Sequence, residues 1–293
     1  MNNSKNILVL GASGMLGNAV LRVFNDSEGY NVRGAVRHNS SIGLFSEDIR
    51  NLVSSGLNID DDESLSNIIV ETESEIVINC IGLVKQLSNS ENPLVALPIN
   101  SLFPHRLAKI CDDNNSRLIH MSTDCVFSGS KGFYNENDTP DSFDLYGVSK
   151  RLGEVDYPNT ITLRTSIIGH ELNTNRSLID WFLSQKGSIE GYTRAIFSGL
   201  PTNEIAKIIR DYVIPNINLT GIYHVSAEPI SKYELLSLVA KIYGKSIKIK
   251  KNNDFEIDRS LDSTRFRDLS GFNPLTWREL VTSMYDFNNK KRM

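Results

Sequence analysis

A strand-like run followed at once by three regularly spaced glycines constrains this chain more than any other feature. Residues 7–10 are apolar without a break, and the turn after them carries Gly11, Gly14 and Gly17. The apolar residues of 15–24 then recur on one side of a helix. A glycine turn between a buried strand and a helix is typical of a dinucleotide-binding βαβ unit.

Each glycine of the turn has its own part in binding a pyrophosphate. Gly11 permits the tight turn, Gly14 lets a phosphate approach the backbone, and Gly17 allows the helix to pack closely on the strand. The start of the helix offers free N–H groups to the phosphates. An ordinary strand–helix turn is the alternative, but strand, spacing and helix all agree with a cofactor loop. The residues expected to contact the cofactor here are Gly11, Ser13, Gly14, Met15, Leu16 and Gly17.

The rest of the first half alternates between strand and helix patterns. The expected strands are residues 32–36, 75–81, 117–121 and 161–164, and the expected helices are 64–70, 102–111 and 145–155. This alternation predicts an α/β fold, a Rossmann-type doubly wound parallel sheet.

After Ser166 the alternation weakens. Helices are expected over 177–185, 203–212 and 231–243, with a strand over 221–225. We predict an NAD(P)-binding Rossmann domain and a smaller C-terminal α/β substrate-binding lobe. The first comprises residues 1–165 plus about 195–225, and the second about 166–194 and 226–293.

Composition excludes several classes of function. The chain has 293 residues, a net charge of −4, and no apolar stretch long enough to span a bilayer. We therefore expect no membrane insertion and no nucleic-acid partner. Cys80, Cys111 and Cys125 are odd in number and lack metal-type spacing, which indicates reduced thiols in the cytoplasm. No required metal is indicated.

The end of the second expected strand bears on the choice of cofactor. An acidic residue there would bind the ribose 2′-hydroxyl of NAD, whereas an arginine would favour the 2′-phosphate of NADP. The strand ends Val36-Arg37-His38, without a carboxylate in register. Arg37 therefore favours NADPH, with NADH left open, although an arginine at an exposed strand end is also common.

Tyr146 and Lys150 lie four residues apart in an expected helix, so their side chains share one face. A tyrosine normally titrates near 10. An ammonium about 4 Å away, at an effective dielectric near 20, would favour the phenolate by about 4 kcal/mol. We therefore expect Lys150 to ready Tyr146 as a proton donor to a developing alkoxide.

A serine and a threonine end the expected strand 117–121. Ser122 and Thr123 should face the ligand crevice, which lies beyond the carboxyl ends of parallel strands. One of these hydroxyls could bind the reacting carbonyl oxygen and hold it against Tyr146. Local backbone capping is the alternative for either residue.

Together these elements resemble the extended short-chain dehydrogenase/reductases, and among them the dTDP-4-dehydrorhamnose reductase family. The resemblance covers residues 7 to about 285. The matching segments are Gly11-x-x-Gly14-x-x-Gly17, Asn79-Cys80-Ile81-Gly82, Ser122-Thr123-Asp124-Cys125-Val126-Phe127, the Tyr146/Lys150 pair, Leu163-Arg164-Thr165-Ser166, Gly199-Leu200-Pro201-Thr202 and Arg259-Ser260-Leu261-Asp262.

The resemblance implies a role for each matching residue. Tyr146 is the proton donor, Lys150 tunes it and binds the nicotinamide ribose, and Thr123 binds the carbonyl oxygen. The other cofactor contacts that it implies are Asn58, Ile59, Cys80, Ile81 and Gly82. The substrate contacts expected are Lys85, Thr123, Asp124, Cys125, Arg194 and Arg259. Because its motif context is the strongest, Arg259 is the first choice for the diphosphate of a sugar nucleotide.

The family implies NADPH-dependent reduction of the 4-keto group of a nucleotide-linked 6-deoxyhexose, for a deoxysugar of a surface polysaccharide. Several departures leave the substrate open. Cys125 replaces a tyrosine, Ser128 an aspartate, and the segments 82–86 and 190–198 are unusual. A UDP-linked N-acetylated sugar therefore competes with the dTDP-linked one. An epimerase or dehydratase, a non-catalytic binding subunit and a homodimer also stay open.

Overall fold

The computed structural model describes residues 4–84 and 90–290. Seven strands form one central sheet in the order β10-β6-β5-β4-β1-β2-β3, and every neighbouring pair is parallel. The strands are β1 (Lys5–Leu10), β2 (Tyr30–Val36), β3 (Val53–Ser55), β4 (Ile76–Asn79), β5 (Arg117–Thr123), β6 (Thr160–Thr165) and β10 (Gly221–His224). The predicted doubly wound α/β fold is confirmed.

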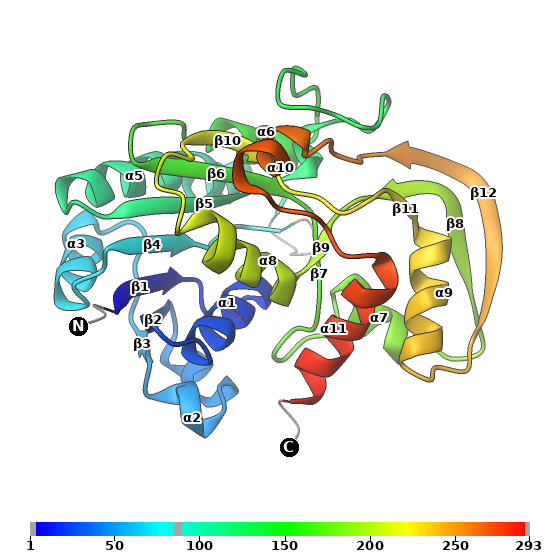
Figure 1. The fold of residues 1–293 in the computed structure, drawn as a ribbon, viewed down its shortest axis with the longest axis horizontal. Helices are drawn as coiled ribbons and strands as arrows, with labels where there is room; N and C mark the ends of the chain where they lie inside the picture. The colour runs from blue at the N-terminus through cyan, green and yellow to red at the C-terminus, as the bar shows by residue number, and fades with distance from the viewer. Residues whose placement is uncertain (1–3, 85–89, 291–293) are drawn as a thin grey trace.

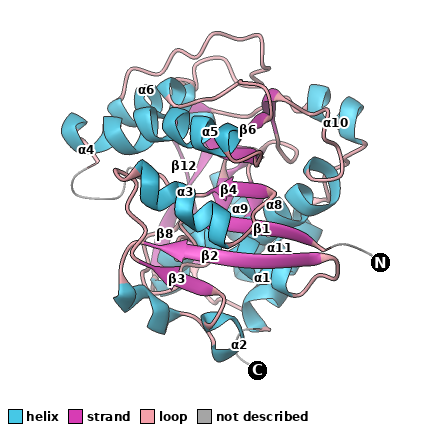
Figure 2. Ribbon diagram, turned by 90° about the vertical axis from the view of Figure 1, so that its left-hand side faces the viewer, coloured by secondary structure: helices cyan, strands magenta, loops and turns pink. Residues whose placement is uncertain are grey.

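Helices cover both faces of this sheet (Figure 2). The long helices beside it are α1 (Met15–Asn25), α3 (Asp62–Glu71), α5 (Phe103–Asp113), α6 (Leu145–Leu152) and α8 (Thr202–Ile208). Successive side chains of β1 point to opposite faces of the sheet, as in any β-strand. Ile7 and Val9 belong to the apolar core that includes α1 and α8, whereas Leu8 and Leu10 belong to the core that includes α3 and α5.

The order of the strands reverses between β1 and β4. From β1 the chain proceeds to β2 and β3 on one side, and from β4 to β5, β6 and β10 on the other. In open α/β sheets, ligands bind beyond the carboxyl ends of the strands at such a reversal. The glycine turn follows β1 there, and the predicted catalytic residues follow β5.

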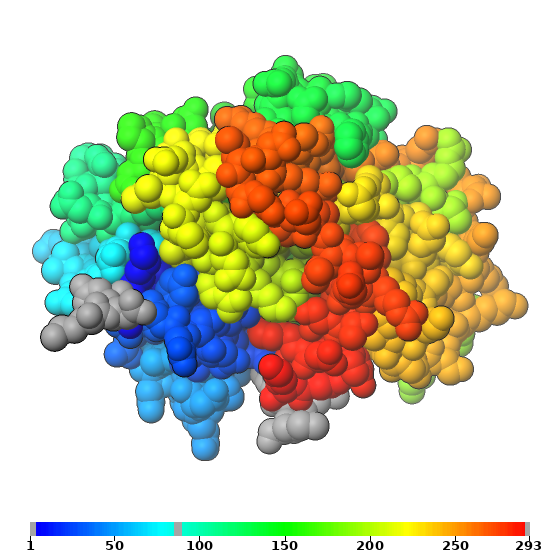
Figure 3. All heavy atoms as spheres, viewed as in Figure 1, coloured from blue at the N-terminus to red at the C-terminus, as the bar shows by residue number. Residues whose placement is uncertain are grey.

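A smaller three-stranded sheet lies at the other end of the molecule (Figure 1). It consists of β11 (Ile230–Ser231), β8 (Ser188–Phe197) and β12 (Lys248–Asp258), and its core includes residues of α7 (Leu178–Ser184), α9 (Lys232–Ile242) and α11 (Trp277–Asn289). Figure 3 shows the red C-terminal segment filling the face between the blue N-terminal part and the gold part around α9.

Several short elements complete the fold. They are η1 (Asn39–Leu44), α2 (Glu47–Arg50), α4 (Pro93–Leu97), η2 (Pro98–Leu102), η3 (Asp124–Val126), β7 (Ile167–Ile168), β9 (Leu200–Pro201), η4 (Ile209–Val213) and α10 (Thr264–Ser270). β7 and β9 pair with each other in parallel.

Ser231 and Glu234 form a capping box at the start of α9, in which each side chain bonds the other's backbone N–H. β8 and β12, by contrast, were not predicted. Most residues of β12 are exposed, so the strand lacks the alternation of apolar and polar residues that marks a half-buried strand.

Candidate active site

The glycine turn is shaped to receive phosphates. Gly11 has a φ of +77°, and a side chain on Gly17 would lie 2.3 Å from the Gly11 carbonyl oxygen, so both positions require glycine. Gly14 caps α1 without a side-chain hydrogen bond. The first-turn amides of a helix have no partner within it. The turn therefore fits a dinucleotide pyrophosphate, with Ser13 and Met15 partly exposed beside it and Leu16 buried in the core.

Arg37 lies at the expected place for recognition of the adenosine ribose. It follows β2, which pairs with β1, and its exposed side chain donates from Nε to His38 Nε2 at 2.7 Å. Asn58 is exposed, and its Oδ1 accepts from the Asp60 amide at 3.1 Å, so part of its bonding capacity serves a local turn. Ile59 is partly buried against the α3–α5 core.

The segment after β4 lies beside Lys150. A Cβ atom on Gly82 would be 3.9 Å from Lys150 Nζ. Burial raises the pKa of the Cys80 thiol to about 12, and the Lys150 charge acts in the opposite direction. Asn79 holds the turn by accepting from the Ile81 amide at 3.0 Å. The structure therefore brings Cys80, Ile81 and Gly82 to the predicted catalytic lysine.

Tyr146 and Lys150 lie on α6, which packs on the turn that follows β5. A side chain on Gly147 would lie 2.3 Å from the Cys125 carbonyl oxygen, so glycine permits this close approach. The helix is capped by Asp144, whose side chain accepts from the Gly147 amide. The Tyr146 hydroxyl is hydrogen-bonded to the side chain of Thr123. Tyrosine and threonine thus meet as the sequence predicts.

The electrostatics of Tyr146 differ from the expectation. Burial raises the pKa of the Tyr146 phenol, and the charges of Cys125 and Asp124 raise it further, while the Thr123 hydrogen bond acts against them. Lys150 Nζ instead donates to the Met121 carbonyl oxygen at 2.7 Å. The expectation that Lys150 lowers the pKa of Tyr146 is wrong for this structure, because burial outweighs any attraction to the ammonium.

Two cations from other parts of the chain reach the residues next to Thr123. Arg259 follows β12, and it donates from Nε to the Phe127 carbonyl oxygen at 2.9 Å and from Nη1 to Cys125 Sγ at 3.5 Å. Burial raises the pKa of the Asp124 carboxyl, and the positive charges of Arg259 and Lys232 oppose that rise. Asp124, Cys125 and Arg259, which the sequence assigned to the substrate, therefore lie together.

Lys232 is a site residue that the sequence analysis missed. It begins α9, and its Nζ lies 4.1 Å from the centre of the Phe197 ring. Burial lowers the pKa of its ammonium, and the charges of Asp124 and Cys125 act against this. A cation in the first turn of a helix opposes the helix dipole. A lysine at this unfavourable position could have marked Lys232 as a candidate site residue, since departures from local preferences concentrate at functional sites.

The other two predicted substrate contacts do not join this group. Arg194 lies on β8, and its guanidinium forms an ion pair with Glu256 of β12, with the two side chains 56% and 64% exposed. Its charge is therefore used on an exposed part of the small sheet. Lys85 lies outside the described residues.

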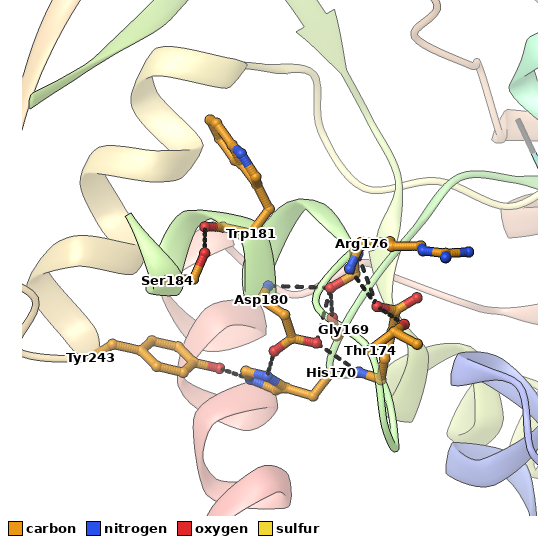
Figure 4. Close-up of polar contacts among 10 residues, drawn as sticks. Gly169, His170, Thr174, Arg176, Asp180, Trp181, Ser184 and Tyr243 are labelled. Carbon is orange, nitrogen blue, oxygen red and sulfur yellow. Dashed lines mark hydrogen bonds and ion pairs between the residues drawn. The ribbon is translucent and has the colours of Figure 1, made fainter. Parts of the chain in front are cut away.

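A second polar cluster lies away from these residues, at the junction of β7, α7 and α9 (Figure 4). His170 contacts Asp180 Oδ1 through Nδ1 at 2.5 Å and the Tyr243 hydroxyl through Nε2 at 2.8 Å. Asp180 also accepts from the Glu171 amide at 2.7 Å. These bonds fasten the loop after β7 to the helices of the small sheet, next to Gly169, which approaches the sulfur of Met15 in α1.

Neither a metal centre nor a membrane span is found in the part of the chain that the structure describes. Residues 4–84 and 90–290 contain no group of three or more His, Cys, Asp or Glu side chains that could hold a metal ion. The helices within the same ranges are all too short or too polar to cross a bilayer.

The family comparison matches almost the whole chain. The model described as the RmlD substrate binding domain matches residues 5–289. A probable low-salt glycan biosynthesis reductase of Haloferax volcanii is 34% identical over 55% of this chain, a match that spans about half (52%) of that relative. The dTDP-4-dehydrorhamnose reductase of Aggregatibacter actinomycetemcomitans is 27% identical, over 78% of this chain and 76% of its own length.

Two further comparisons bear on function and fold. The methionine adenosyltransferase 2 subunit beta of Danio rerio is 27% identical, over 82% of this chain and 74% of its own length. A crystal structure of dTDP-4-dehydrorhamnose reductase from Bacillus anthracis in complex with NADP has a TM-score of 0.77. It is 19% identical and covers 97% of this chain and 99% of its own, a likeness of fold.

Proposed function

Because this chain belongs to the RmlD substrate-binding domain family, we propose that it is an NADPH-dependent reductase of the 4-keto group of a nucleotide-linked 6-deoxyhexose. The observation that carries the proposal is the contact between the Thr123 and Tyr146 side chains, one helical turn from Lys150. A proton donor, a second hydroxyl and a cation beside the end of β5 can stabilise and protonate a carbonyl oxygen while a hydride reduces its carbon.

The cofactor assignment rests on the glycine turn and Arg37. The first-turn amides of α1 would hold the pyrophosphate, and Arg37 would bind a 2′-phosphate. NADP is the nucleotide in the Bacillus anthracis structure, which supports the same choice here. NADPH, when bound, supplies a hydride to the carbonyl carbon. Lys150 would bind the nicotinamide ribose, with Cys80 and Gly82 beside it.

The chain's own residues would handle the oxygen of the substrate. Tyr146 gives its hydroxyl proton to the oxygen as the carbonyl carbon is reduced. The phenol is protonated at neutral pH, so the proton is available at the start of the reaction, and the raised pKa of the free site is a cost that binding of cofactor and substrate must offset. Thr123 holds the same oxygen, and fixing both groups beside it supplies much of the rate advantage.

For the sugar nucleotide, we propose that Arg259 and Lys232 supply the positive charge that a diphosphate needs. The segments 166–194 and 226–293 would form the substrate lobe that carries them. A dTDP-linked sugar is favoured by the match to a dTDP-4-dehydrorhamnose reductase over 78% of the chain. Cys125 and the unusual segment 190–198 keep a UDP-linked N-acetylated sugar as the competing substrate.

A non-catalytic subunit is the second candidate. It is favoured by the similarity to methionine adenosyltransferase 2 subunit beta, which extends over 82% of the chain. Intact Thr123, Tyr146 and Lys150 favour the enzyme instead. A dehydratase is less well supported, because only Asp124 supplies an acid next to Thr123 and Cys125 follows it.

The test offers dTDP- and UDP-linked 4-keto-6-deoxyhexoses to the purified chain with NADPH or NADH. We expect one NADPH to be oxidised for each sugar reduced, with faster turnover than with NADH. Turnover without added cofactor would support an epimerase or dehydratase. Binding of nucleotide without oxidation of NADPH by any of the sugars would support the subunit.

A further inference from the structure

Glu154 is a buried carboxylate that the proposed reaction does not use. It lies four residues after Lys150, and its side chain is 4% exposed. Its Oε1 accepts from Ser122 Oγ at 2.6 Å and from Arg164 Nε at 2.8 Å, and its Oε2 accepts from Arg164 Nη2 at 2.7 Å. A buried charge is costly unless it is paired and hydrogen-bonded, and Glu154 meets both conditions.

The backbone fixes where Glu154 enters the core. The preceding Gly153 ends α6, and a side chain on it would lie 1.9 Å from the Asn100 carbonyl oxygen. Glycine is therefore required where the end of α6 packs closely against η2. The carboxylate of the next residue, Glu154, lies at the ends of β5 and β6, where it contacts Ser122 and Arg164.

The contacts of Glu154 join the elements that carry the catalytic groups. Ser122 precedes Thr123 on β5, and Arg164 lies beside it on β6, in register with Ser122. Lys150 of α6 donates to Met121 on the same strand β5. The Glu154 carboxylate therefore ties the helix with Tyr146 and Lys150 to the strand with Thr123.

Arg164 extends the network to the edge strand β10. Its Nη1 lies 3.2 Å from His224 Nε2, and His224 Nδ1 lies 3.0 Å from the Tyr134 carbonyl oxygen. Burial, with the Arg164 charge, lowers the pKa of His224 to about 3, so this imidazole is neutral and accepts from Arg164. It adds no charge to the network.

Glu154, Cys80 and His120 interact electrostatically with Lys150, and Tyr146 lies one helical turn away on α6. Burial lowers the pKa of Lys150 to about 8, while the charge of Glu154 opposes this. The Cys80 thiol, with its pKa raised to about 12, is neutral at working pH. Burial lowers the pKa of His120 well below its usual value, so it is neutral too, and the Tyr146 phenol is protonated. Within the described residues, Glu154 is the group that supplies negative charge to Lys150.

We propose that Glu154 is a positioning residue: its bonds to Ser122 and Arg164 fix the ends of β5 and β6, and with them the Lys150 side chain that donates to Met121. The role rests on the proposed reductase activity, since it acts through the lysine of that site. A purely structural ion pair with Arg164 would share the same contacts, so the test must read the protonation of Lys150 itself.

The experiment follows Lys150 by NMR in the full chain labelled with 13Cε-lysine. The Lys150 signal is assigned by its loss in Lys150→Arg, and its titration midpoint is compared between wild type and Glu154→Gln. Because Glu154 acts to raise the pKa of Lys150, its neutralisation should lower the midpoint by about one pH unit. An unchanged midpoint would overturn the proposal.

Glu136→Gln is the matched control. Glu136 is partly exposed and accepts from the His224 amide at 2.8 Å, on the far side of the network from Lys150. Its neutralisation should leave the Lys150 midpoint in place. An equal shift in both variants would mean that any nearby carboxylate has the effect, and would also overturn the proposal.

Kinetics provide the second readout. The alkaline limb of kcat should move to lower pH in Glu154→Gln, whereas a structural pair alone would lower kcat by one factor at every pH. If Glu154→Gln does not fold, Glu154→Met/Arg164→Met removes both charges together, a change that buried pairs often tolerate. The Lys150 midpoint should fall in this variant as well.

The two proposals fail in different ways. If no sugar nucleotide supports oxidation of NADPH, the proposed function is wrong, yet the NMR titration still reports on Glu154 and Lys150. If reduction occurs and the midpoint does not move in Glu154→Gln, the function stands and the role of Glu154 is wrong.

Discussion

The strand ends of the large sheet and the β8–β12 pair of the small sheet handle charge in opposite ways. At the large sheet, Arg164 and Glu154 are 5% and 4% exposed and share two hydrogen bonds. On the small sheet, Arg194 and Glu256 form one ion pair that is more than half exposed. Buried pairs hold geometry firmly, whereas exposed pairs are screened and weakly coupled.

This contrast shows which side chains the fold holds most firmly. The predicted catalytic groups lie on strand ends and on a helix that pack in the core, where side chains can be held to within a fraction of an ångström, as catalysis requires. Arg259 and Lys232 reach the same place from the small sheet and from α9, which begins beside it. The predicted site therefore has two halves. The rigid half consists of Thr123, Tyr146 and Lys150, and the charged half consists of Arg259 and Lys232, which another part of the chain supplies.

The largest effect is expected for the rigid half. Tyr146→Phe removes the proton donor and should lower kcat roughly 10²- to 10⁴-fold, with little change in NADPH binding. Turnover is followed by NADPH absorbance, and cofactor affinity by fluorescence titration. Tyr157→Phe, at an exposed position just before β6, is the control and should have wild-type kcat. A Tyr146→Phe enzyme with normal turnover would refute the catalytic assignment.

Arg259 and Arg194 give a direct comparison of the two regions. Arg259→Ala should raise KM for the sugar nucleotide about 10- to 100-fold, since Arg259 is partly buried and a hydrogen bond to a charged group typically contributes about 1.5–3 kcal/mol. Arg194→Ala should change KM less than about twofold, because its charge is already paired on an exposed surface. Equal effects from the two substitutions would mean that the small sheet moves when the substrate binds.

The pH dependence of kcat/KM tests whether the charge of Lys232 acts on Asp124. Its charge lowers the pKa of Asp124, so Lys232→Met should raise that pKa and leave Asp124 protonated to a higher pH. We expect the acid limb of kcat/KM to move to higher pH, with a several-fold rise in KM. Lys241→Met, an exposed position on the same helix, serves as the control. An acid limb that stays in place would separate Lys232 from Asp124.

The smallest effect is expected for the exposed pair itself. A double-mutant cycle of Arg194→Ala and Glu256→Ala, read by urea denaturation, should give a coupling free energy below about 1 kcal/mol that declines with salt. A coupling well above this value would show that the β8–β12 pair is held as firmly as the catalytic edge.

Much of the fold follows from local patterns. The glycine turn, the placement of Tyr146 and Lys150 on one helix, and the capping box at Ser231 depend on residues only a few positions apart. Such short-range signals are explicit in the sequence, and they led to a parallel sheet with a cofactor turn after β1. β8 and β12 were not predicted, because exposed strands lack a clear alternation of apolar and polar residues.

Neighbouring residues were enough to predict the glycine turn, the helix with its tyrosine and lysine, and the strand that ends in Thr123. The folded chain was needed to show that Lys232 and Arg259 lie near Asp124, that Arg194 pairs with Glu256, and that burial raises the pKa of Tyr146. The physical reason is range. Hydrogen bonds and periodicity within one element act over a few residues, whereas charge pairing joins segments far apart in the chain, from 62 residues for Arg194 and Glu256 to 135 for Asp124 and Arg259.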